Sequence, residues 1–159
     1  MGIDSMSARR TPERNSPLLG SSVAVNPGVV ATITVGSGTT PLTLTAAQLL
    51  VGLLPLNCTD TGTLTLPTAT LLAAAIPGIA VGNWFEFTIV NYGDSTATVA
   101  VGTGITSKVI DSESAILTTL ATHVGARFAL VCTGVAKVND PSTSNTFDLY
   151  LLGTSTCTA

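Results

Sequence analysis

The only histidine of the chain, His123, is the residue on which acid–base or nucleophilic catalysis would have to depend. A Ser-His-Asp or Cys-His arrangement needs an acid that orients the histidine, and here Asp111 or Asp140 would have to do so. However, His123 stands in the run Ala-Thr-His-Val-Gly, which is typical of a loop and contains no nucleophile elbow. We therefore expect a turn or interface histidine, and a single histidine excludes a metal site built from several.

Two pairs of acidic residues could serve as the acid and base of a glycosidase: Asp111 with Glu113, and Glu86 with Asp94. Sugar-cleaving sites usually present aromatic platforms. The chain has seven aromatic residues, and four of them fall in rows that we expect to face inward: Phe85, Phe87, Phe128 and Phe147. The acids are therefore expected to solvate turns, and the sequence predicts a protein that is not an enzyme and needs no cofactor.

Cysteine and glycine spacings predict no metal or phosphate site. Cys58, Cys132 and Cys157 are far apart and show no C-x-x-C spacing, so we expect reduced, buried thiols and no zinc site or disulfide framework. The runs Gly36-Ser-Gly38 and Gly102-Thr-Gly104 lack the lysine and the long helix of a phosphate-binding loop. They are expected to be turns.

Composition favours a β protein with a surface prone to association. The 159 residues suit one domain, and they include 27 threonines, whose β-branched side chains suit half-exposed strands. Only 9% are charged, against about 25% in an average domain, while the mean hydropathy is +0.54. The net charge of −3 argues against a nucleic-acid partner, and the absence of an uninterrupted apolar run of about 18 residues argues against a membrane helix.

Residues 1–28 are predicted to form an extended N-terminal arm. They are rich in Ser, Pro and Arg and show neither helical nor strand periodicity. Arg9, Arg10 and Arg14 supply half of all lysines and arginines, but three charges make few phosphate contacts. We expect the arm to dock on neighbouring protein subunits; a solvated tail is the alternative.

From residue 29 onward the pattern predicts a single all-β domain, residues 29–159. Apolar and polar residues alternate in short runs separated by turn residues. Expected strands cover residues 29–35, 42–44, 54–59, 63–66, 84–91, 96–101, 116–120, 127–133 and 147–152, about eight in all because the second is marginal. Two short helices are expected, one after a capping box formed by Thr45 and Gln48, and one over residues 69–76. The predicted fold is a jelly-roll-like sandwich of two sheets.

Trp84 lies in the clearest of these strands but has the opposite parity to Phe85, Phe87 and Ile89. Residues of opposite parity face opposite sides of a sheet, so Trp84 is expected outside the inner row. It is either covered by a loop or serves as an anchor at a subunit interface.

Three segments, Thr63–Thr70, Gly82–Asn91 and Thr96–Val101, together with the short Ala-rich helix between the first two, resemble jelly-roll domains of virion structural proteins from large DNA viruses and tailed phages. The likeness extends over about residues 55–152 and consists of strands and turns. It implies a capsid, vertex or decoration component, with copies arranged as a trimer or pentamer and bound to other capsid proteins in the virion. The alternative is a receptor- or glycan-binding module at the tip of a viral fibre, since one sandwich can carry either function.

The arm can be tested by deletion. A chain that begins at Val29 should keep its β spectrum and nearly its melting temperature, because no inward-facing row of residues is removed. It should nevertheless enter the assembly poorly, because it lacks the docking arm. Replacing Arg9, Arg10 and Arg14 by Gln should weaken incorporation more at low salt than at high salt, where charges are already screened. Normal incorporation of the shortened chain would reduce the arm to a passive tail.

Overall fold

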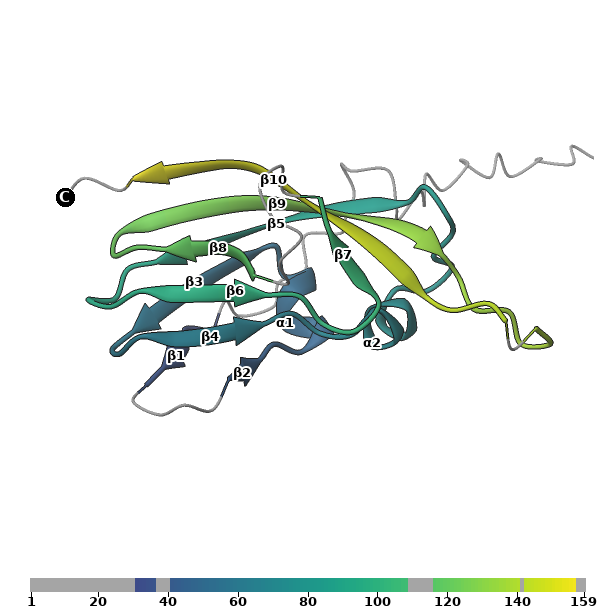
Figure 1. The fold of residues 1–159 in the computed structure, drawn as a ribbon, viewed down its shortest axis with the longest axis horizontal. Coiled ribbons are helices and arrows are strands. Elements are labelled where there is room, and N and C mark those ends of the chain that lie inside the picture. Colours follow the sequence, from purple (N-terminus) through teal and green to yellow (C-terminus); the bar gives the residue numbers. More distant parts are fainter. Residues whose placement is uncertain (1–30, 37–40, 109–115, 141, 157–159) are drawn as a thin grey trace, which may run out of the picture.

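Two β-sheets and two short helices make up the computed structural model, which describes residues 31–36, 41–108, 116–140 and 142–156 (Figure 1). One sheet has six strands in the order β1-β3-β5-β9-β10-β7, and the other has four in the order β2-β4-β6-β8. The expected all-β architecture of two sheets is confirmed. The elements are β1 (Ile33–Val35), β2 (Leu42–Thr43), α1 (Ala46–Leu50), β3 (Leu53–Cys58), β4 (Gly62–Thr65), α2 (Ala69–Ala75), β5 (Trp84–Asn91), β6 (Ala97–Ala100), β7 (Ile105–Ser107), β8 (Ile116–Leu120), β9 (Val124–Gly134) and β10 (Thr146–Thr156).

The connectivity differs from the one expected. Successive strands from β1 to β6 alternate between the two sheets, and β1, β3 and β5 pair in parallel, as do β2, β4 and β6. A jelly roll is built from antiparallel strands, so the jelly-roll part of the prediction is not confirmed. The described residues also hold ten strands where about eight were expected, the additional ones including β7. Alternation within a strand predicts which residues face inward, but it is the same for parallel and antiparallel neighbours.

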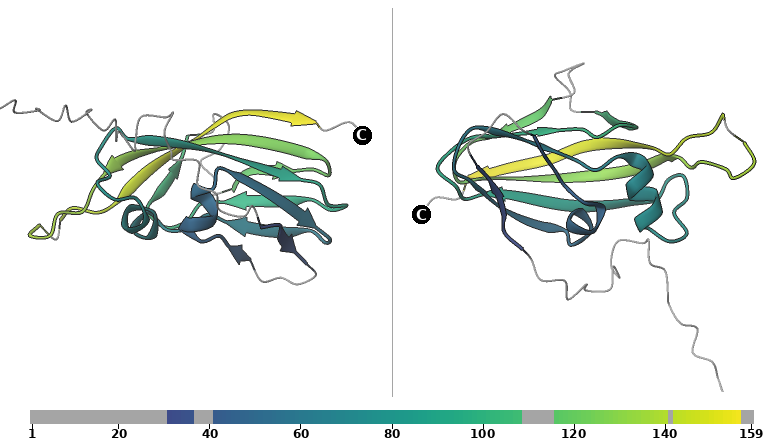
Figure 2. Two further views of the ribbon diagram at one scale, coloured as in Figure 1. Left: turned by 180° about the vertical axis from the view of Figure 1, so that it is seen from behind. Right: turned by 90° about the horizontal axis from the view of Figure 1, so that it is seen from below.

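Both helices form where the chain crosses from the four-stranded to the six-stranded sheet, and they contact each other (Figure 2). The predicted capping box is confirmed. The Thr45 hydroxyl accepts a hydrogen bond from the Gln48 amide at 3.2 Å, and the Gln48 side chain accepts one from the Thr45 amide at 2.8 Å. The Thr68 hydroxyl caps α2 by accepting from the Leu71 amide at 3.3 Å, although the apolar Leu71 side chain returns no bond, and this helix ends just before Pro77.

At the opposite end, tight turns join the sheets, and Asn91 is buried among them. Its Nδ2 donates to the carbonyl oxygens of Ser95 at 2.8 Å, and of Leu120 and Ala121 at 3.1 Å, while its Oδ1 accepts from the Gly93 amide at 3.1 Å. Asn91 therefore links the end of β5 to the β5–β6 turn and to the end of β8. Gly93 permits this close packing, since a Cβ there would lie 2.2 Å from the backbone nitrogen of Cys58.

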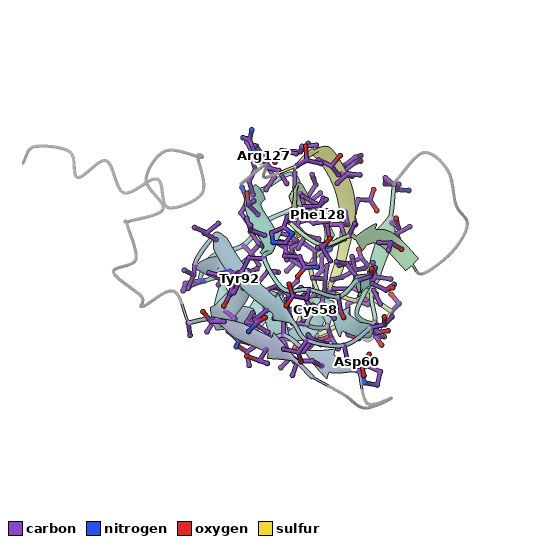
Figure 3. The ribbon with its side chains drawn as sticks, turned by 90° about the vertical axis from the view of Figure 1, so that its left-hand side faces the viewer. Cys58, Asp60, Tyr92, Arg127 and Phe128 are labelled. Carbon is purple, nitrogen blue, oxygen red and sulfur yellow. The ribbon has the colours of Figure 1, made fainter. Side chains whose placement is uncertain are left out.

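The core lies between the two sheets and follows the predicted inner rows. Phe87 and Phe128 stack at its centre with ring centroids 5.2 Å apart. Figure 3 shows that consecutive side chains of β9 point to opposite sides of the sheet: Phe128 points into the interior and Arg127 points away from it. The predicted parity of β5 is confirmed, because Phe87 is 1% exposed and Trp84 is 42% exposed.

Truncating Phe87 tests the register of β5. Phe87→Ala should lower the free energy of unfolding by about 3 to 5 kcal/mol, because it opens a cavity beside Phe128. Thr88→Ala, next in sequence but on the outer side of the sheet, is the matched control and should cost much less. The measurement is chemical denaturation followed by circular dichroism, and equal losses for the two variants would contradict the register.

The buried amide gives a second test. Asn91→Ala leaves one amide and three carbonyl groups without this partner, and we expect a loss of at least about 2 kcal/mol of unfolding free energy. Asn83→Ala is the control, since Asn83 caps only the Ala80 amide in an exposed turn. Similar melting temperatures for the Asn91 variant and the unaltered protein would show that the link is dispensable.

Candidate functional site

The outward-pointing side of β3, β5, β9 and β10, called here the outer face, carries several exposed apolar side chains. Strand register places Trp84 beside Val131, Ala129 between Glu86 and Tyr150, and Thr88 between Leu53 and Arg127. Three large apolar side chains on it remain open to solvent: Leu53 is 46% exposed, Trp84 42% and Tyr150 38%. An open apolar sheet face of this kind is typical of an interaction surface.

Charges on the outer face occur in opposite pairs. The Arg127 Nε donates to Glu86 Oε2 at 2.8 Å, and its Nη2 reaches the same oxygen. Lys108 Nζ lies 3.7 Å from Asp148 Oδ2 at the side of the face. Exposed pairs of this kind add little to folding stability, about 0 to 1 kcal/mol. Their consequence here is a face that carries both signs but no net charge.

The structure does not bring His123 together with Asp140. His123 occupies an exposed turn between β8 and β9 with a φ of 59°. Asp140 follows the other end of β9, which is 11 residues long, about 35 Å at the usual rise. Asp140 instead accepts hydrogen bonds from the side chain and the backbone of Ser142, which hold the pKa of its carboxyl below the usual value. Asp111, the other expected partner, lies outside the described residues.

The acid pairs considered from sequence are not assembled as pairs either. Glu86 lies within β5 and bonds Arg127, whereas Asp94 occupies the turn beyond the end of that strand. Glu113 lies outside the described residues, as Asp111 does. Within the described ranges, no three His, Cys, Asp or Glu side chains gather as a metal site would require.

The described cysteines are free and buried, as predicted, and burial raises the pKa of both the Cys58 and the Cys132 thiol. Cys157 lies outside the described residues. So do Arg9, Arg10 and Arg14 of the predicted arm. Of the residues singled out from sequence for a role in binding, Trp84 alone is placed by the structure. The sequence did not predict the ion pair of Glu86 and Arg127 on the same face as Trp84, because these two residues are 41 positions apart in the chain.

A second open feature is the loop between β9 and β10, which projects beyond the sandwich (Figure 1). Two hydrogen bonds brace the loop: the Ala136 amide donates to Asn145 Oδ1 at 2.9 Å, and the Lys137 amide donates to Thr143 Oγ1 at 2.7 Å. Val138 at its tip is completely exposed. The loop thus presents a small, braced apolar tip.

Comparisons with known proteins found no relative of this chain. No protein-family model, curated protein or solved structure matches the chain. None of the described helices is long and apolar enough to span a membrane.

Proposed function

We propose that this protein is a non-enzymatic structural component of a virus particle, and that it acts by assembling with copies of itself and with other capsid proteins. The observation that carries the assembly part is the open outer face, with Leu53, Trp84 and Tyr150 exposed on one sheet. Burial of such a face contributes about 25 cal/mol for each Å² of apolar surface removed from water.

Chain composition supports the same function. With 9% charged residues and a mean hydropathy of +0.54, the surface carries few of the charges that keep proteins apart. Closed symmetry multiplies each contact without leaving sticky edges, which is why we propose a trimer or pentamer as the assembled unit. The virion as its location rests on the resemblance of the strand and turn pattern. Neither a cofactor nor a nucleic-acid or membrane partner is part of this proposal.

The alternative function is receptor or glycan binding at the tip of a viral fibre. The projecting β9–β10 loop with Val138 at its tip is the observation that favours it. Glycan sites usually offer aromatic rings, and residues 135–145 contain none. We therefore place the assembly function first.

The molecular mass in solution tests the proposal. Light scattering and sedimentation of the purified full chain, over a wide concentration range, should give a closed oligomer of three or five times 16.0 kDa, or twice that mass where two rings pair. Trp84→Ser should shift this equilibrium toward smaller species, because it removes the largest exposed apolar side chain, whereas Val138→Ser should leave it unchanged. A 16.0 kDa monomer at high concentration that also fails to bind any capsid protein would refute the assembly function.

A further inference from the structure

We propose that the outer face is the docking site for a second copy of this chain, and that the two copies pack sheet against sheet about a two-fold axis. This inference rests on the proposed assembly function and names the partner and contact for one of its surfaces. On its own, the two-fold contact gives a dimer. If each copy also belongs to a trimeric or pentameric ring through another surface, the two-fold contact joins two such rings.

The charge pattern suits a second copy as the partner. Glu86 and Arg127 adjoin each other on neighbouring strands β5 and β9. A two-fold axis lying in the plane of contact and passing between them brings Glu86 of one copy opposite Arg127 of the other, and the reverse. Glu86 and Arg127 would then each face a charge of opposite sign, so the central ion pair is complementary to its own copy.

A strongly charged partner would find no such match. The described residues carry three cations and five acids, but the outer face holds only the balanced pairs Glu86–Arg127 and Lys108–Asp148. The side chains around the central pair are threonine and apolar residues, which suit the dry packing of one sheet on another. The ion pair would set orientation and register, and the apolar residues would supply most of the affinity.

The face is large enough for a specific contact. Four strands at a spacing of about 4.8 Å cover roughly 19 Å, and strands of 6 to 11 residues run for roughly 20 to 36 Å. The flat projection is therefore on the order of 600 Å², and projecting side chains increase the accessible area above that figure. Standard interfaces bury about 800 Å² on each partner, so this face is of the required size.

Charge reversal provides a sharp test. Arg127→Glu and Glu86→Arg should each weaken self-association by at least about tenfold, because like charges then face each other across the contact. Mixing the two variants should restore association as a heterodimer, since one chain carries two acids at these positions and the other two bases. The mixture is decisive because neither variant regains the ion pair within its own chain.

Controls separate docking from folding. Lys137→Glu reverses a charge on the projecting loop, off the outer face, and should leave self-association unchanged. The double variant Glu86→Arg/Arg127→Glu should associate as the unaltered protein does. Circular dichroism melting establishes that every variant is folded. Trp84 is the only tryptophan, so its fluorescence should shift to shorter wavelength as concentration rises and the face becomes buried.

Each outcome is distinguishable. If the single variants keep the original assembly, or if their mixture fails to recover association, the outer face is not the two-fold contact, while the assembly function stands through another surface. Another outcome is that Trp84 emits at short wavelength while the protein is a monomer at every dilution. This result would mean that another segment of the same chain, such as residues 1–30, covers the face, and it would overturn the inference. A chain that remains a monomer and binds no capsid protein would defeat the proposed function as well.

Discussion

The buried side-chain amide of Asn91 is a polar contact that links the two sheets directly. It ties the last residue of β5, in the six-stranded sheet, to the turn that leads into β6 and to the end of β8, in the four-stranded sheet. A buried amide is stable only when its polar atoms are bonded, so this position tolerates little movement. The close approach of Gly93 to Cys58 places the neighbouring turn under the same restriction.

The alternating path of the chain explains why one sheet face stays open. Because the chain crosses between the sheets after each strand from β1 to β6, the inner rows meet in one core and the described helices lie at the crossings. Neither helix is left to cover the outer face of the six-stranded sheet (Figure 2). In many other folds, helices pack against the face of a sheet and cover it. Here Trp84, Leu53 and Tyr150 remain exposed, and the proposed assembly rests on this observation.

Function has to be argued from this surface, because a two-sheet sandwich serves many unrelated roles. Among the described residues, the groups considered for catalysis are not brought together: His123 precedes β9 and Asp140 follows its other end, and Glu86 is engaged by Arg127. What remains concentrated is apolar area with balanced charge. That combination is better suited to repeated contact between like molecules than to the recognition of a charged ligand.

Residue patterns within each segment were sufficient to predict β5 and β8 at their observed bounds, the capping box of Thr45 and Gln48, and the opposite sides taken by Phe87 and Trp84. These features depend on side-chain parity and on bonds between near neighbours in the chain. The parallel pairing, the passage between sheets and the Glu86–Arg127 pair could not be predicted in this way, nor could β7, a strand of three residues. They arise from contacts between distant segments, and the same alternating pattern of residues is compatible with several such pairings.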